Sequence, residues 1–96
     1  MAEILSLAIF VPLPESQEAA LGTIRELGAA LAKAGYGRDL VYRDAKSGHY
    51  VLLRYWRSEE SRRAALEDPE VLRCWAKLAQ EIRTISVMET LDEVGG

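Results

Sequence analysis

Four segments with strand-like composition and two segments with helical periodicity alternate along the 96 residues, in the order strand, helix, strand, strand, helix, strand. Right-handed crossovers place both helices on one face of a four-stranded antiparallel sheet when the elements follow this order. The sequence therefore predicts an α+β sandwich, with residues 1–96 forming one domain. The composition agrees, because 49% apolar and 28% charged residues are typical of a folded globular chain.

The first strand is expected at Ile4–Val11, a short run that ends before two prolines. Both faces of this strand are apolar, which indicates that both sides of the sheet are covered there. A helix is expected over residues 15–34, because five apolar residues at spacings of three and four build one stripe. These residues are Ala20, Ile24, Leu27, Leu31 and Ala34. Gly35 has the position of a C-cap glycine.

A β-hairpin is expected next, with strands at Leu40–Arg43 and His49–Trp56 joined by a turn in which Gly48 takes a positive φ. Alternate residues of the second strand share a face. One face carries Val51, Leu53 and Tyr55, and the other carries Tyr50, Leu52, Arg54 and Trp56. The first of these faces is the more apolar, so we expect it to pack against the helices.

The second helix is expected to begin after Ser58, whose hydroxyl can cap it. Asp68 and Pro69 interrupt this helix. Because proline suits the first turn of a helix but not its interior, we expect a restart with Asp68 as N-cap and Pro69 as the first residue. The last strand is expected at Thr84–Leu91. The complete order, β-α-β-β-α-β, is that of the ferredoxin-like sandwich.

The sheet face opposite the helices is expected to be apolar and uncovered within one chain. Its predicted members are Phe10, Tyr50, Leu52, Trp56 and Met88. An apolar patch of this extent marks an interface or a ligand site. The simplest cover is a two-fold homodimer in which the two sheets face each other and enclose a shared barrel. We therefore predict a homodimeric α+β barrel with space for a small aromatic ligand.

Charge and residue usage exclude several other classes of protein. A formal net charge of −3 argues against a nucleic-acid partner, which would need a basic face. We find no transmembrane segment and no signal peptide, so we expect no membrane partner and a cytoplasmic protein. One histidine and one cysteine cannot form a His- or Cys-based metal site, so no metal is expected. Cys74 lies in no Cys-His pair or CxxC motif and is interpreted as an inert thiol.

Residues Tyr50 to Glu60 read Tyr-Val-Leu-Leu-Arg-Tyr-Trp-Arg-Ser-Glu-Glu and precede an amphipathic helix that is broken at Asp68 and Pro69. This segment resembles the antibiotic-biosynthesis-monooxygenase-like family, whose third strand ends in Trp before a short Ser/Glu-rich cap. The resemblance implies a small dimeric α+β barrel over nearly the whole chain. It implies less about activity, because this fold also hosts haem-degrading enzymes, isomerases, dehydratases and proteins without a known reaction.

Two departures from the family pattern narrow the expected chemistry. Quinol-oxidising members have an Asn four residues before the Trp, where this chain has Leu52. Haem-degrading members use a His on the second helix and an Asn on the first strand, and this chain has neither. Haem degradation is therefore not expected, and Trp56 alone carries over from the family's site residues.

Arg54 and Trp56 are the candidate catalytic residues, because they lie two apart on one strand and project from the same face. Trp56 could pack against a planar aromatic substrate, and Arg54 could stabilise a phenolate. In the structural alternatives, Trp56 fills the core or the dimer interface. Arg54 then pairs with Glu89 or Asp44.

The candidate substrate-binding residues are Tyr50, Tyr42, Leu52, Phe10, Met88 and His49. Tyr42 and Tyr50 could donate hydrogen bonds from their hydroxyl groups. Histidine is the usual general base near neutral pH, so His49 is a formal candidate for that role. Its place beside the hairpin turn favours a solvated side chain instead.

Two functions remain open from the sequence. The first is a cofactor-independent monooxygenase for a small aromatic or polyketide-like substrate of the quinol or phenol type. Such a substrate supplies its own electrons to oxygen, so no cofactor is expected. The second is a non-catalytic dimeric module that binds small molecules. An open lumen with convergent polar groups would favour the enzyme, and a lumen filled with apolar side chains would favour the module.

Overall fold

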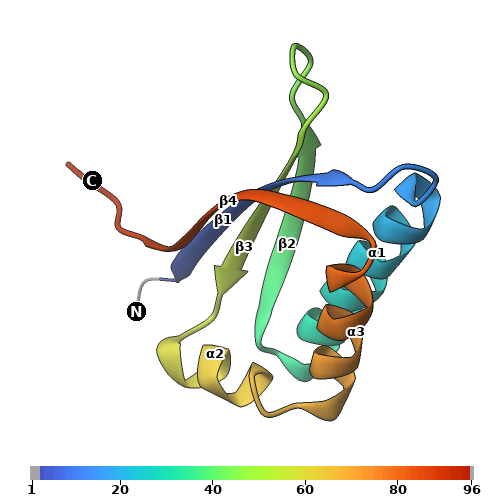
Figure 1. Ribbon diagram of the computed structural model, residues 1–96. Coiled ribbons are helices and arrows are strands. Elements are labelled where there is room, and N and C mark those ends of the chain that lie inside the picture. Colours follow the sequence, from blue (N-terminus) through green and yellow to red (C-terminus); the bar gives the residue numbers. More distant parts are fainter. Residues whose placement is uncertain (1–2, 96) are drawn as a thin grey trace.

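The computed structural model of the protein describes residues 3–95. The strands are β1 (Ile4–Pro12), β2 (Gly37–Arg43), β3 (Tyr50–Trp56) and β4 (Ile82–Leu91), and the helices are α1 (Gln17–Ala34), α2 (Glu59–Ala65) and α3 (Pro69–Ala79). The strand order in the sheet is β2-β3-β1-β4, and every neighbouring pair is antiparallel. Helices α1 and α3 pack side by side against one face of the sheet, and α2 lies below the end of β3 (Figure 1). The ferredoxin-like α+β fold predicted from the sequence is confirmed.

The helix boundaries follow the local signals in the sequence. Gly35 ends α1 in the left-handed region, with φ of 78°. The Ser58 hydroxyl accepts a hydrogen bond from the backbone N–H of Ser61 at 3.0 Å and caps α2. Asp68 accepts from the backbone N–H of Glu70 at 2.9 Å, and Pro69 is the first residue of α3. The predicted break of the second helix is therefore confirmed, and it separates two helices.

No helix within residues 3–95 is both long enough and apolar enough to cross a membrane.

The hydrophobic core lies between the sheet and the two long helices. Its fully buried members include Phe10 from β1, Leu27 and Leu31 from α1, and Val71 and Cys74 from α3. Burial raises the pKa of the Cys74 thiol, because the thiolate would lose its hydration in this environment. The thiol form is therefore favoured over the thiolate at neutral pH.

The face of β3 that packs against the helices is the opposite of the one predicted. Leu52, Arg54 and Trp56 are buried, at 8%, 8% and 4% exposure, and they face the helices. Val51, Leu53 and Tyr55 lie on the other face and are only partly buried. The prediction counted Arg54 as a polar residue that would avoid the helix side. Asp39 neutralises it there, so the rest of that face packs as core.

The sheet face that the helices leave uncovered is also largely apolar. Neighbouring strands place Leu5 opposite Tyr55, Leu7 opposite Leu53 and Ile9 opposite Val51 on it. Leu40, Tyr42 and Met88 extend the same face and are more exposed. An uncovered apolar face was expected, but its predicted members Phe10, Tyr50, Leu52 and Trp56 were wrong, because these residues lie on the helix side.

Candidate functional site

A cavity of about 220 Å³ lies between the sheet and the helices, near the end of β3. Strands β1, β3 and β4 supply one wall, and α2, the turn after it and α3 supply the other. Its lining residues are Ser6, Leu7, Ala8, Leu52, Arg54, Trp56, Arg62, Leu66, Trp75, Val87 and Glu89. Both tryptophans of the chain belong to this lining. The lining is mainly apolar with a few charged groups, which is the usual character of a small-molecule site.

Arg54 lines the cavity and forms a buried ion pair with Asp39. Its Nε donates to Oδ1 of Asp39 at 2.7 Å, and its Nη2 donates to Oδ2 at 2.8 Å. The two side chains are only 9% and 6% exposed. Gly28 of α1 lies beside the pair, and a Cβ there would make an ordinary van der Waals contact with the Asp39 carboxylate at 3.4 Å. Nη1 of Arg54 has no hydrogen-bond partner among residues 3–95, so it is the nitrogen left for a ligand.

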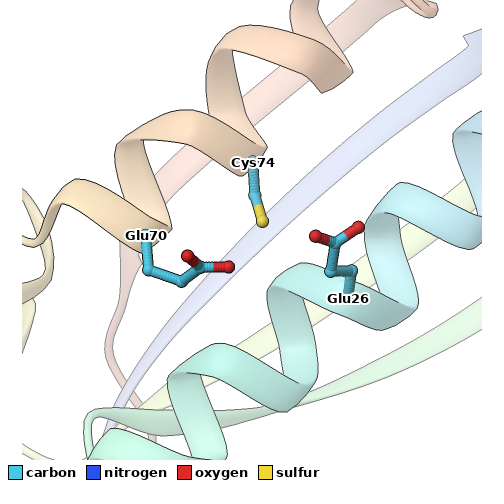
Figure 2. Close-up of side chains that lie close together, drawn as sticks. All are labelled: Glu26, Glu70 and Cys74. Atoms are coloured by element: carbon cyan, nitrogen blue, oxygen red, sulfur yellow. The ribbon is translucent and has the colours of Figure 1, made fainter.

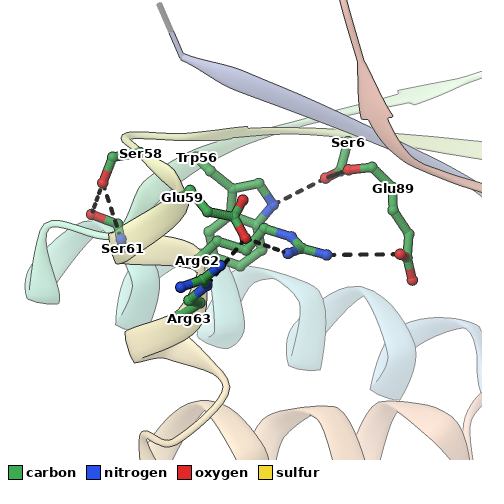
Figure 3. Close-up of polar contacts among 8 residues, drawn as sticks. All are labelled: Ser6, Trp56, Ser58, Glu59, Ser61, Arg62, Arg63 and Glu89. Carbon is green, nitrogen blue, oxygen red and sulfur yellow. Dashed lines mark hydrogen bonds and ion pairs between the residues drawn. The ribbon is translucent and has the colours of Figure 1, made fainter. Parts of the chain in front are cut away.

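The indole of Trp56 is held in place by a short chain of hydrogen bonds to two other strands. Its N–H donates to Oγ of Ser6 at 3.0 Å, and Ser6 donates to the backbone carbonyl of Glu89 at 2.6 Å (Figure 3). The Arg54 guanidinium carbon lies 5.6 Å from the centre of the indole ring. Trp56 therefore contributes a fixed aromatic surface to the cavity, and its N–H is already used.

Arg62 brings a second guanidinium to the cavity, from α2. Its Nη1 donates to Glu59 at 3.0 Å, and its Nη2 lies 3.7 Å from Oε2 of Glu89 on β4 (Figure 3). The Arg62 side chain is 25% exposed, whereas that of Glu89 is 75% exposed. Arg62 was not among the site residues predicted from the sequence, although it lines the cavity. No spacing within α2 indicates this position, because it depends on how the ends of the α2 segment are held by residues elsewhere in the chain.

Tyr36 anchors both ends of the segment that carries α2. Its backbone carbonyl accepts from the N–H of Arg57 at 2.8 Å, before the helix. Its hydroxyl donates to Oδ2 of Asp68 at 2.8 Å, after the helix. This hydrogen bond lowers the pKa of the Asp68 carboxyl and raises the pKa of the Tyr36 hydroxyl. The segment that carries Arg62 is therefore fixed at both ends to Tyr36, the residue directly before β2.

The structure brings three of the eight sequence-predicted site residues together in this cavity. They are Arg54, Trp56 and Leu52. Arg54 has the carboxylate partner foreseen in the structural alternative, but that partner is Asp39 and not Glu89 or Asp44.

The other five predicted residues lie elsewhere. Phe10 is in the core and stacks on Tyr50 with ring centres 5.6 Å apart. The Tyr50 hydroxyl accepts from the Gln17 side chain at 3.0 Å. Tyr42 and Met88 lie on the uncovered sheet face, and His49 precedes β3 at the hairpin turn. These five residues therefore do not share a cavity with Arg54, Trp56 and Leu52.

Trp75 and Ser6 belong to the cavity but were not predicted there. Trp75 is partly buried against the core and lines the cavity from α3. Ser6 is the polar residue that β1 contributes to the lining. Its position directly opposite Arg54 in the sheet was the signal that the strand pairing could have given.

A cluster of metal-type ligands, Glu26, Glu70 and Cys74, lies between α1 and α3 (Figure 2). Arg73 bridges its carboxylates, since Nη2 donates to Glu26 and, at 2.6 Å, to Glu70. This cation lowers the pKa of Glu26 and leaves the carboxylates already neutralised. The cluster therefore acts as an ion-pair network that joins the two helices, and it is not a metal site as it stands.

The fold and the cavity together define a ferredoxin-like α+β protein with a ligand-sized space between sheet and helices. No family model and no curated protein matches the sequence. Solved structures match it over almost the whole chain. SnoaB, a cofactor-independent oxygenase from Streptomyces nogalater, has a TM-score of 0.78 at 16% identity, with 100% of both chains covered.

Two further solved structures show the same likeness. A protein of Chloroflexus aurantiacus that is proposed to be an antibiotic biosynthesis monooxygenase has a TM-score of 0.77 at 19% identity, with 99% of this chain and 97% of that chain covered. Rv0793 from Mycobacterium tuberculosis has a TM-score of 0.74 at 19% identity, with 98% and 100% covered. The chain thus has the fold of the antibiotic biosynthesis monooxygenases, as the sequence resemblance implied.

Proposed function

We propose that this protein is a cofactor-independent monooxygenase for a small aromatic substrate of the quinol or phenol type. The observation that carries the proposal is the cavity lined by two indoles and by a guanidinium with one unused nitrogen, Nη1 of Arg54. The name of SnoaB as a cofactor-independent oxygenase supports the reaction type. A cavity of about 220 Å³ suits one substituted ring, because about 150 Å³ holds a benzene molecule.

The substrate supplies all four electrons in this reaction. A phenolate passes one electron to O₂, and the resulting substrate radical and superoxide combine to form a C–O bond. The O–O bond then breaks as the ring carbon loses its proton, and the outer oxygen leaves as water. The net change converts a hydroquinone and O₂ into a hydroxyquinone and water, so that one oxygen atom enters the product.

The proposed roles of the two residues follow from their surroundings. Trp56 holds the ring by packing, because its indole is fixed by Ser6. Arg54 stabilises the phenolate through Nη1, while Asp39 fixes the orientation of the guanidinium. Because the Arg54 guanidinium is almost completely buried, such stabilisation is worth roughly 3 kcal/mol, or about a hundredfold in rate. A role of Tyr50, Tyr42, Phe10, Met88 or His49 in this site has no support from their positions.

A non-catalytic small-molecule-binding module is the second candidate. The Trp56 N–H and two of the three Arg54 nitrogens are committed to bonds within the chain. A site that serves only to bind could use its polar groups in this way. In that case ligands enter the cavity without consumption of oxygen.

Oxygen uptake with hydroquinone and its ring-substituted analogues tests the proposal. The wild type should consume oxygen faster than the spontaneous oxidation of each quinol, with one atom of ¹⁸O₂ in the quinone. The matched variant is Arg54→Met with Asp39→Leu, which removes the buried pair together and leaves no uncompensated charge. Its rate should fall about a hundredfold. If the wild type never consumes oxygen faster than the quinol oxidises spontaneously, the oxygenase proposal is wrong and the non-catalytic binding module remains.

We further propose that the protein is a cytoplasmic homodimer. The uncovered sheet face, with Leu5, Leu7, Ile9, Leu53 and Met88, supports the dimer, because a water-exposed apolar surface of this extent is unusual for a monomer. The interface proposed here uses this face and replaces the one expected from the sequence.

A further inference from the structure

We infer that Arg62 selects the substrate and that the preferred ligand is an aromatic ring that carries a carboxylate. The inference deepens the proposed function and rests on it for the quinol character of the ring. The first observation is the position of Arg62, whose guanidinium lines an otherwise mainly apolar cavity together with Trp56 and Trp75.

The second observation is the incomplete use of the Arg62 guanidinium. Nη1 donates to Glu59, but Nη2 makes no hydrogen bond within residues 3–95. The nearest carboxylate, Glu89, lies 3.7 Å away, beyond hydrogen-bonding distance. Figure 3 shows Arg62 between these two acidic residues. A ligand carboxylate can therefore accept a charge-assisted hydrogen bond from Nη2 without breaking any hydrogen bond of the protein.

The third observation is the exposure of Glu89. Three-quarters of its side chain is accessible to solvent, so the carboxylate keeps its hydration and is weakly held beside Arg62. A ligand carboxylate that is packed against two indoles exchanges less readily with water. It should therefore displace the Glu89 carboxylate. The charge at the cavity wall then selects an acidic aromatic ligand over its neutral counterpart.

Arg54 is less suited to this role. Asp39 already binds two of its nitrogens, and the pair is almost completely buried. Bringing a second carboxylate to that guanidinium would place two anions in a region with little water. A neutral or weakly charged hydroxyl oxygen fits Nη1 of Arg54, and a full carboxylate fits Nη2 of Arg62. The two arginines thus recognise different oxygens of one ring.

The test compares 2,5-dihydroxybenzoate with hydroquinone, which differ by one carboxylate. Calorimetry measures both affinities, and the fluorescence of the two tryptophans reports ring binding in the cavity. The wild type should bind 2,5-dihydroxybenzoate about tenfold more tightly. Arg62→Gln should abolish this preference, so that the two ligands bind with similar affinity. Glu89→Gln should strengthen 2,5-dihydroxybenzoate binding several-fold, because it removes the competing carboxylate.

Arg63→Gln is the matched control, because Arg63 lies on the same helix, also pairs with Glu59 and is 78% exposed. It should keep the preference. The inference would be overturned if the preference for 2,5-dihydroxybenzoate persists in Arg62→Gln or disappears in Arg63→Gln. It would also be overturned if the folded wild type does not bind 2,5-dihydroxybenzoate. Oxygen uptake separates the two proposals. If 2,5-dihydroxybenzoate binding depends on Arg62 but no oxygen is consumed, the inference about the acidic ligand holds and the proposed oxygenase activity is wrong. If oxygen is consumed but the preference does not depend on Arg62, the oxygenase activity holds and the inference is wrong.

Discussion

Arg54 of β3 and Asp39 of β2 form a two-hydrogen-bond ion pair inside the protein, with both side chains less than one-tenth exposed. The residues are direct neighbours across the two strands, so the pair is fixed by the register of the hairpin. Its position explains why a charged residue lies on the buried face of β3. The same pair sets the orientation of the guanidinium that faces the cavity.

Removing one member of this pair should be far more costly than removing both. Arg54→Met leaves the Asp39 carboxylate buried and uncompensated, and we expect a loss of about 3–5 kcal/mol in the free energy of unfolding. The double variant with Asp39→Leu should recover most of this loss. Urea unfolding measures both. The exposed Arg63→Met serves as the control, and equal losses in single and double variants would contradict the expectation.

The uncovered sheet face should control the assembly state. Leu53→Asp places a charge on this face, so it should give folded monomers, because the helix-side core is untouched. Leu52→Asp places the charge among buried residues on the other face and should unfold the chain. Light scattering and circular dichroism separate these outcomes. A wild type that is a stable monomer at micromolar concentration would rule out the dimer.

Gly37 should tolerate no side chain, because a Cβ there would lie 2.5 Å from the backbone carbonyl oxygen of Tyr55. Gly37→Ala should therefore lower the stability by about 2 kcal/mol, which is the usual cost of forcing extra atoms into a packed site. Gly22→Ala is the natural comparison, since no atom lies within 4 Å of that Cβ position. It should stabilise α1 by up to about 1 kcal/mol. Thermal unfolding of the two variants should show shifts of opposite sign.

The contact between Tyr36 and Asp68 should make stability depend on acid pH. The hydroxyl of Tyr36 lowers the pKa of Asp68 below its ordinary value of 3.8. The folded state therefore holds the carboxylate more favourably than the unfolded chain. This contribution is present above pH 3.8 and is lost as the pH falls through the lower folded pKa.

Tyr36→Phe removes the hydroxyl and should raise the pKa of Asp68 toward its ordinary value. The stability difference between the wild type and the variant should be largest near neutral pH and should shrink in acid. An NMR titration of the Asp68 carboxyl measures the shift directly. An unchanged pKa in the variant would show that the hydrogen bond does not set it.

Local sequence signals were sufficient to predict where the helices begin and end, because each cap or turn depends on residues only a few positions apart. Ser58, Asp68 with Pro69, and Gly35 all have the predicted roles. Which face of β3 packs against the helices was harder to predict, because Asp39, the partner of Arg54, lies 15 residues away in the chain. The strand predicted from Leu40 stopped one residue short of Asp39. Extending the hairpin register by that residue would have placed the carboxylate opposite Arg54.

The cavity could not be predicted from the sequence for a different reason. Its walls come from three strands and two helices, and the position of α2 is set by contacts of Tyr36 with residues on both sides of the helix. No pattern within α2 indicates that Arg62 lies near Glu89. A pairing between residues so far apart in the chain follows from the tertiary arrangement alone.

The Arg73 bridge between α1 and α3 leads to the last prediction. Glu26, Glu70 and Cys74 place their ligand atoms within 4.8 Å of one another, and Arg73 neutralises both carboxylates. Arg73→Ala removes the cation, so the variant should bind Zn²⁺ where the wild type does not. The affinity should rise with pH, because burial raises the pKa of the Cys74 thiol and Zn²⁺ binds the thiolate.

Arg73 is about half exposed, so its removal should leave the fold intact. Calorimetry with Zn²⁺ and the shift in unfolding temperature measure binding, and the double variant with Cys74→Ser should lose it. Equal Zn²⁺ binding by the wild type would mean that Arg73 leaves the cluster readily. In that case the ion-pair network would not be what keeps metal from these three residues. Absence of binding in Arg73→Ala at high pH would show instead that the two helices hold the ligands too rigidly for a metal ion.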